Sequence, residues 1–297
     1  MDGDALTKAA VARFTLALDP ADVGERRATA AIVGAPYEAT ECFRAGAAGG
    51  PAAIRRMSDS LETYSSVLEA DLEDVTIVDN GDVELEGADV DGALGRIEAA
   101  FAAAVQASAL AVMLGGEHTV SLAAYRAVRW LHPEAALVQV DAHADLRAQW
   151  EGRAITHASW THQAGVEFGF DNIYQLGVRS LAREEWDAAR LRVAWHNEAL
   201  TFPDTVAAQL RRRPVYLTID IDVLDPAAAP GTGCPEPGGV TFRDLQHLLY
   251  VLGAFDVVAF DVVEVAPRLD PAEITAAAAA KLVREAILLF GGQRERR

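Results

Sequence analysis

The chain has 297 residues, enough for one large α/β domain or two ordinary ones, and its 51% hydrophobic and 24% charged residues are typical of a globular protein. Its 44 acidic side chains outnumber the 26 basic ones and give a formal net charge of -18, which disfavours nucleic acids and anionic membrane surfaces as partners. Such a negative field would attract a small cationic substrate, although an acidic surface that only confers solubility explains the charge equally well.

The chain carries two cysteines, Cys42 and Cys234, which lie far apart in sequence and form no C-x-x-C motif. The sequence therefore predicts neither a zinc ribbon nor a disulfide scaffold. Residues 1–14 lack the apolar run of a signal peptide, and no stretch approaches the roughly 20 uninterrupted apolar residues of a membrane span. We therefore expect a cytoplasmic protein that does not enter a membrane.

Short apolar runs alternate along the chain with segments of helical spacing. The predicted strands are 30–33, 76–78, 109–114, 136–140, 173–176, 215–221 and 257–262. The predicted helices include 51–57, 90–107, 120–130, 183–191, 202–210, 241–252 and 272–289. This alternation is typical of a doubly wound α/β fold with a parallel sheet, in which ligands bind beyond the carboxyl ends of the strands.

No internal repeat and no low-complexity linker divides the chain. Residues 226–239 are dense in proline and glycine, but they lie between a predicted strand and a predicted helix. We therefore interpret them as an ordered active-site loop and predict one domain over residues 1–297.

A first polar cluster, Gly-Gly-Glu-His-Thr at 115–119, directly follows an apolar strand. The two glycines allow a sharp turn that would bring His118 to the rim of the sheet. A single histidine after a strand is often only a structural hydrogen-bonding group, so this motif alone does not predict a metal ligand.

The second cluster, Asp-Ala-His-Ala-Asp at 141–145, follows the predicted strand 136–140. In an extended segment alternate side chains point the same way, which would bring Asp141, His143 and Asp145 together. A solvated polar loop is the alternative. However, three ionisable groups at a buried sheet edge would be costly without a cation, and the cluster therefore predicts a metal site.

Two further clusters end later strands. Asp220 and Asp222 would share a face, either as a proton-sharing catalytic pair or as metal ligands, and the Asp-Ala-His-Ala-Asp motif favours metal. Asp225 precedes a proline, which favours a role in a turn. Glu264 follows the strand at 257–262 and could hold a cationic substrate group, although an ordinary ion pair is an alternative.

Two imidazoles and four carboxylates exceed the needs of one ion, and two divalent ions roughly 3.5–4 Å apart would use them well. Such a pair lowers the pKa of a shared water molecule, which suits hydrolysis. Carboxylate-rich coordination without thiolate favours manganese over zinc, while nickel, cobalt and iron stay possible. The predicted metal ligands are His118, Asp141, His143, Asp145, Asp220 and Asp222.

These motifs together resemble those of the ureohydrolases, a family that includes arginase, agmatinase, guanidinobutyrase and formimidoylglutamase. The resemblance covers nearly the whole chain and includes, in the family's order, GAPY at 34–37, GGEHT at 115–119, DAHAD at 141–145, THAS at 156–159, DIDVLDP at 220–226, APGTGCPEPGG at 229–239 and DVVEVAP at 261–267. Residues 44–55 and 61–85 look more like those of bacterial and archaeal agmatinases than like those of arginases.

The resemblance implies a three-layer α/β/α fold with a mostly parallel, about eight-stranded sheet, two Mn²⁺ ions per subunit and a homo-oligomer, trimeric or hexameric. It implies that Asp141 and Asp220 bridge the two ions, that Asp145 also orients the attacking oxygen, and that Glu264 holds the guanidinium group. His157 matches the family's proton-shuttling histidine, although a surface histidine is an alternative. The implied catalytic residues are thus Asp145, His157 and Glu264.

The implied reaction is hydrolysis of a small cationic guanidino substrate, with agmatine, which yields putrescine and urea, as the leading candidate. N1-aminopropylagmatine, guanidinobutyrate, arginine and a formimino substrate stay open, because the segment Arg147-Ala148-Gln149-Trp150 departs from both the arginase and the agmatinase pattern. Cys234 also replaces the threonine usual in its loop. A family member that binds metal without catalysis is the alternative among proteins that are not enzymes. A dinucleotide-binding protein is disfavoured, because the sequence lacks the required G-x-G-x-x-G motif between a strand and a helix.

Overall fold

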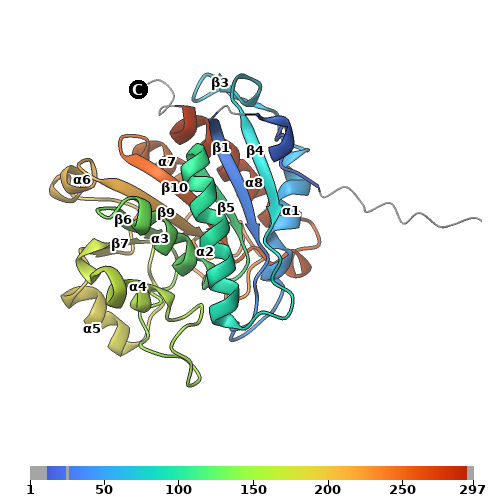
Figure 1. The fold of residues 1–297 in the computed structure, drawn as a ribbon. Helices are drawn as coiled ribbons and strands as arrows, with labels where there is room; N and C mark the ends of the chain where they lie inside the picture. The colour runs from blue at the N-terminus through green and yellow to red at the C-terminus, as the bar shows by residue number, and fades with distance from the viewer. Residues whose placement is uncertain (1–11, 25–26, 293–297) are drawn as a thin grey trace, which may run out of the picture.

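Eight strands form one sheet in the order β4-β1-β5-β10-β9-β6-β7-β8 in the computed structural model, which describes residues 12–24 and 27–292 (Figure 1). Every pairing in this sheet is parallel. Its strands are β1 (Ala28–Ala35), β4 (Ile77–Asp82), β5 (Ser108–Gly115), β6 (Ala136–Val140), β7 (Ile173–Leu176), β8 (Trp195–Asn197), β9 (Pro214–Asp220) and β10 (Asp256–Val263). A separate antiparallel pair joins β2 (Tyr64–Ser65) to β3 (Ala70–Asp71).

Helices cover both faces of the sheet. They are α1 (Gly50–Ser58), α2 (Val90–Ala107), α3 (Val120–Leu131), α4 (Trp160–Phe168), α5 (Arg183–Leu191), α6 (Asp204–Leu210), α7 (Phe242–Leu252) and α8 (Ile274–Ala286), which continues as a π-helical turn (Ile287–Gly291). Short 3-10 turns lie at Pro20–Asp22, Ala47–Gly49, Leu72–Asp74, Phe170–Asn172, Ile221–Val223 and Pro267–Leu269.

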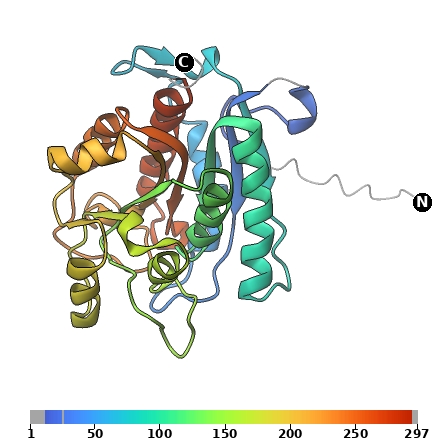
Figure 2. The same ribbon diagram turned by 60° about the vertical axis from the view of Figure 1, so that its left-hand side comes forward.

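The two faces of the sheet carry separate apolar cores. Helices α1, α6, α7 and α8 pack on one face, and α2, α3 and α4 pack on the other. Figure 2 shows α2 and α8 on opposite sides of the sheet. Along β1, Ala30 and Ile32 join the first core, whereas Ala31 and Val33 join the second. This alternation explains why the strands read as continuous apolar runs, since both faces are buried.

The predicted three-layer α/β/α fold is confirmed, and each predicted strand overlaps an observed one. The prediction did not include β8, whose three half-buried residues carry little apolar signal, or α4, which follows the Thr-His-Ala-Ser segment. Residues 1 and 297, the limits of the predicted domain, lie outside the described residues. The same holds for most of the N-terminal segment 1–14. Within the described ranges, no helix has both the length and the apolar character required to cross a membrane.

The order of the strands determines where the polar clusters meet. β5, β10, β9 and β6 are neighbours at the centre of the sheet, although they come from distant parts of the chain. Because all four run in the same direction, the segments that follow them emerge at one edge. This edge therefore receives all four clusters.

Candidate functional site

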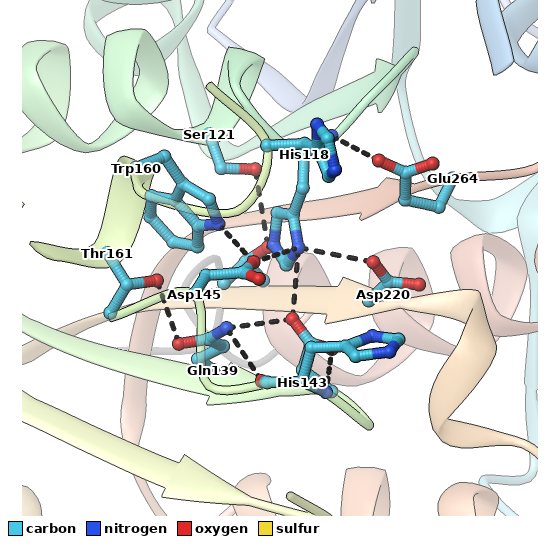
Figure 3. Close-up of polar contacts among 12 residues, drawn as sticks. His118, Ser121, Gln139, His143, Asp145, Trp160, Thr161, Asp220 and Glu264 are labelled. Atoms are coloured by element: carbon cyan, nitrogen blue, oxygen red, sulfur yellow. Dashed lines mark hydrogen bonds and ion pairs between the residues drawn. The ribbon is translucent and has the colours of Figure 1, made fainter. Parts of the chain in front are cut away.

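The segments after the four central strands bring all the predicted metal ligands to one pocket. The pocket has a volume of about 310 Å³, within the range of small-molecule sites. His118, His143, Asp145, Asp220 and Asp222 line it, and Asp141 lies buried directly beneath them. Figure 3 shows His118 between Asp145 and Asp220, with Glu264 on the other side of the histidine backbone.

His118 is the centre of the first group of ligands. Its Nδ1 atom lies 3.0 Å from Asp141 Oδ2, 3.3 Å from Asp145 Oδ2 and 3.2 Å from Asp220 Oδ2. Its Nε2 atom lies 2.9 Å from the Thr218 hydroxyl, which fixes the rotation of the ring. One imidazole nitrogen therefore faces three carboxylate oxygens.

A second group shares Asp141 with the first. His143 Nδ1 lies 2.8 Å from Asp222 Oδ2 and 3.7 Å from Asp141 Oδ1. The ligand atoms of His118, Asp141 and Asp145, and likewise those of Asp141, His143 and Asp222, are close enough together to hold one cation per group. Two adjacent groups with a shared carboxylate match the geometry of a two-metal centre.

The donors also fit cations chemically. His118 Nδ1 is buried and has no hydrogen-bond partner, although three carboxylates surround it. Burial and the nearby Asp222 and Asp141 raise the pKa of Asp220 well above its usual range, and burial with Asp141 raises the pKa of Asp145. Such crowding of acidic groups is relieved by divalent cations. The cluster is therefore a candidate metal site.

The side chains converge as predicted, but the local backbone differs from the prediction. Residues 141–145 are irregular, and Asp145 adopts a left-handed conformation with φ of 51°. β9 ends at Asp220, and Asp222 lies in the following 3-10 turn, where its N–H donates to Asp220 Oδ1 at 2.8 Å. Tight turns beyond the strand ends therefore bring these side chains together, and strand alternation does not.

Close packing explains the two glycines before His118. A Cβ atom on Gly116 would lie 2.1 Å from the Tyr37 carbonyl oxygen, and one on Gly115 would lie 2.5 Å from a Val263 methyl group. The turn thus passes directly against the segment that follows β1. Its Glu117 N–H donates to the same Tyr37 carbonyl at 2.9 Å.

Glu264 lines the pocket next to the candidate metal ligands. Its Oε1 accepts a hydrogen bond from the His118 N–H at 2.7 Å, and its backbone is left-handed with φ of 63°. Burial raises the pKa of this carboxyl group to about 8. Left-handed backbone at Glu264 and Asp145 is unfavourable for non-glycine residues, and strained positions of this kind often occur in functional sites.

His157 lies in the pocket wall and not on the outer surface. Its Nδ1 lies 3.3 Å from the Thr40 hydroxyl, and its ring hydrogen bonds to Cys42. Burial alone would lower the pKa of His157, but the Cys42 contact and the charges of Glu264 and Asp145 outweigh it and raise the pKa to about 9. His157 therefore carries a proton at neutral pH.

The residues that orient the candidate ligands were not predicted from the sequence. The indole Nε1 of Trp160 donates to Asp145 Oδ2 at 2.8 Å, and the amide of Gln139 donates to Asp141 Oδ2 at 2.7 Å. Gln139 in turn accepts from Thr161 and from Gln175. A signal did exist, because polar residues such as Gln139 and Gln175 within buried strands require partners.

Glu117 is another residue whose role was missed. It is buried and accepts hydrogen bonds from the Ala39 and Thr40 N–H groups, both at 2.8 Å, and from the hydroxyls of Thr40 and Thr119. The Thr40 hydroxyl in turn contacts the ring of His157 and accepts a hydrogen bond from the His157 N–H. Glu117 therefore connects the first polar cluster to the segment that positions His157.

The predicted turn role of Asp225 is confirmed. Its side chain accepts hydrogen bonds from the N–H groups of Ala227, Gly238 and Gly239, which closes the proline- and glycine-rich loop on itself. Arg179 holds the same region by donating to the carbonyls of Asp222 and Glu236. The loop is therefore ordered, as expected.

The outer wall of the pocket includes the segment that departs from the family pattern. The Arg147 guanidinium lies 4.6 Å from the centre of the Trp150 ring and within 3.3 Å of Glu184. Both Arg147 and Trp150 line the pocket, together with Glu41 on its exposed rim.

Comparison with known proteins gives consistent results. The model of the arginase family matches residues 28–289. An agmatinase of Halalkalibacterium halodurans is 38% identical over 267 residues, which cover 88% of this chain and 92% of that protein. A guanidinobutyrase of Pseudomonas aeruginosa is 32% identical, with 89% of this chain and 86% of that protein covered.

The similarity extends to solved structures. The crystal structure of the agmatine ureohydrolase of Thermoplasma volcanium superimposes with a TM-score of 0.81 and 31% sequence identity. The match covers 92% of this chain and 94% of that one. The resemblance stated from the motifs is thereby confirmed.

Trp160→Phe should weaken metal binding without unfolding the protein, because it removes only the indole N–H that orients Asp145. Loss of such a supporting hydrogen bond typically costs about 10- to 100-fold in metal affinity. Calorimetric titration of metal-free protein with Mn²⁺ measures this change. Trp130→Phe, at an exposed tryptophan far along α3, is the matched control. Equal affinities of the two variants would contradict a positioning role for Trp160.

Proposed function

This chain belongs to the arginase family and is a hydrolase that acts on carbon–nitrogen bonds of linear amidines, and we propose that its substrate is agmatine, which it cleaves to putrescine and urea. The observation that carries the proposal is the position of Glu264. Its carboxylate faces the pocket directly beside the candidate metal cluster. A planar guanidinium bound there would have its carbon close to the cluster.

The candidate cluster would hold two divalent ions, and the carboxylate-rich donor set favours Mn²⁺. One ion would be held by His118, Asp141, Asp145 and Asp220, and the other by Asp141, His143, Asp220 and Asp222. When bound, the ions supply a nucleophile by lowering the pKa of water. The close approach of His118 Nδ1 to Asp141, Asp145 and Asp220 supports the first assignment.

Glu264 and His157 would perform the remaining steps. Glu264 would bind and orient the guanidinium through charge-assisted hydrogen bonds, because the bound cation favours the ionised carboxylate and offsets the burial that raises its pKa to about 8. Asp145 would orient the attacking oxygen, because Trp160 fixes the direction of its carboxylate. His157, which is protonated at neutral pH, would donate the proton that the departing amine requires. All three residues lie in the wall of the same pocket.

The charge of the pocket supports a cationic substrate. Carboxylates outnumber the two guanidinium groups, Arg44 and Arg147, among the lining residues. The distal ammonium group of agmatine would meet Glu41, which lies on the exposed rim. Glu41 is the carboxylate available to this ammonium group, because residues 147–150 carry none.

Arg147 supports a second candidate substrate, guanidinobutyrate. Its guanidinium lies in the pocket wall, stacked against Trp150, and could bind a carboxylate at the far end of the substrate. However, Glu184 and Glu185 partly neutralise Arg147, at 3.3 Å and 3.6 Å, which favours agmatine. N1-aminopropylagmatine, which extends the cationic tail, and arginine are the other substrates to compare.

We also propose that the protein acts in the cytoplasm as a homo-oligomer, a trimer or hexamer, as its family resemblance implies. The negative net charge supports a small cationic substrate as its partner and disfavours nucleic acid.

The proposal is tested by measuring urea release from manganese-loaded protein with agmatine, N1-aminopropylagmatine, arginine and guanidinobutyrate in parallel. Agmatine should give the highest kcat/KM, and Asp141→Ala, which removes the shared carboxylate, should abolish urea release from every compound. A preference for guanidinobutyrate would instead indicate that Arg147 binds the carboxylate at the far end of the substrate. Absence of urea from all four compounds, with metal bound, would favour a metal-binding protein without this catalysis.

Glu264→Gln should mainly weaken substrate binding, because it removes the negative charge but retains the size of the side chain. A hydrogen bond to a charged group contributes roughly 1.5–3 kcal/mol, so KM should rise about 10- to 100-fold. Steady-state kinetics measures this rise. Glu198→Gln, which makes the same substitution at an exposed residue outside the pocket, is the control. An unchanged KM would remove Glu264 from guanidinium binding.

His157 should determine how the rate falls at alkaline pH. Because the pKa of its ring is raised to about 9, it is protonated below this pH and loses its proton above it. kcat should therefore decline above pH 9. His157→Asn should lower kcat by about 10²-fold or more and remove this decline. His247→Asn, on the exposed side of α7, should leave the pH profile of kcat as it is. If His157→Asn kept the same decline of kcat above pH 9, the group that loses its proton there would be a different one.

A further inference from the structure

The two cysteines meet at the mouth of the pocket, although 192 positions separate them in the sequence. The Sγ atoms of Cys42 and Cys234 lie 3.7 Å apart. Cys42 belongs to the segment after β1, and Cys234 to the proline- and glycine-rich loop after β9. Both line the pocket together with His157 and Glu264.

Hydrogen bonds independently hold the two segments together. The Arg44 guanidinium, two residues from Cys42, donates to the Gly233 carbonyl at 3.1 Å and to the Thr232 carbonyl at 2.8 Å. A Cβ atom on Gly233 would lie 2.9 Å from the Arg44 carbonyl oxygen, so the two backbones are in direct contact beside the thiols. A disulfide of about 2.05 Å would therefore require the sulfur atoms to approach, while the segments already lie side by side.

The two thiols differ in their surroundings. Cys42 is exposed, and hydrogen bonds from Cys234 and His157 lower the pKa of its thiol. Cys234 is half-buried, and its contact with Cys42, together with burial, raises the pKa of its thiol. An exposed thiol beside a protonated histidine is the arrangement of a reactive cysteine, and a nearby second thiol is able to resolve its oxidised form.

We propose that Cys42 and Cys234 form an oxidisable dithiol site, in which a peroxide converts the pair to a reversible disulfide that lowers the activity of the adjacent site. The proposal stands on the 3.7 Å separation of the sulfur atoms, the Arg44 bonds that join the two segments, and the position of both thiols with His157 in the lining of one pocket. Its effect on activity rests on the proposed function.

The chemistry balances with one peroxide per pair. The Cys42 sulfur attacks one oxygen of hydrogen peroxide and the O–O bond breaks. Cys42 keeps this oxygen as a sulfenic acid, and the other oxygen departs as water. The Cys234 sulfur then attacks the Cys42 sulfur. The S–O bond breaks, and the hydroxyl group leaves as a second water with the Cys234 proton. The two thiols are oxidised, the peroxide is reduced, and an external thiol reverses the reaction.

The disulfide would affect catalysis through His157. Cys42 is a hydrogen-bond partner of the His157 ring, and a disulfide sulfur carries neither the proton nor the negative charge of the free thiol. His157 would therefore lose a contact that orients it and favours its protonated form. The new bond would also join two segments of the pocket wall covalently.

The test uses the reduced, metal-loaded full chain treated with hydrogen peroxide. Digestion without reductant should yield a linked pair of peptides that contain Cys42 and Cys234, and both free thiols should disappear. Urea release should fall by about tenfold or more, since a positioned proton donor typically contributes 10²–10⁴-fold. Dithiothreitol should restore both thiols and the rate.

Two variants separate the roles of the thiols, each compared with its own rate before oxidation. Cys42→Ser should resist peroxide, because the reactive thiol is gone. Cys234→Ser should be inactivated irreversibly, because Cys42 without a partner proceeds to the sulfinic acid, which dithiothreitol does not reduce.

The peptide map reports the disulfide even if none of the guanidino compounds is hydrolysed, so it is independent of the proposed function. Peroxide-treated protein in which both thiols stay free, or in which the linked peptides derive from two different chains, would overturn the dithiol site. Linked peptides with an unchanged rate of urea release would overturn its effect on activity.

Discussion

The structure depends on the burial of four carboxylates at the ends of its central strands. Asp141, Asp145, Asp220 and Asp222 are all less than 10% exposed and lie within a few ångströms of two imidazoles. Like charges at such distances are unfavourable in a protein interior, and without cations the cluster responds by raising the pKa of Asp220. Divalent ions bound at this candidate site would remove this cost and would thereby couple metal binding to the stability of the sheet edge.

A shell of neutral polar groups positions these charges. Trp160, Gln139 and Thr218 each donate to, or contact, a different ligand residue, and each is itself buried. Buried polar groups are costly unless they are satisfied, which limits the side chains to one arrangement. Turns beyond the strand ends bring the candidate ligands together, and these groups on α4, β6 and β9 then fix the orientation of the ligand side chains.

The sequence was sufficient to predict the fold and the position of the cluster for a physical reason. Apolar runs mark buried strands, and polar residues such as Asp141 and Asp220 directly after those runs mark the edge where parallel strands end. It was not sufficient for the turns, because neither Asp145 nor Glu264 is a glycine, the residue that would mark left-handed backbone in the sequence. The proximity of Cys42 and Cys234 could not be predicted either, because β1 and β9, which their segments follow, are separated in the sheet by β5 and β10, so the contact depends on the paths of the loops.

The base and the rim of the pocket are encoded in different parts of the chain. The candidate metal ligands follow central strands at the edge of the sheet, whereas the rim consists of loop residues such as Glu41, Trp150 and Cys234. Rim residues can therefore change without moving the ligands, provided that anchors such as Arg44 and Asp225 keep the loops in place. A single hydrolytic centre can then serve different guanidino substrates, and a thiol pair can be added at its entrance, because neither change disturbs the buried charges below.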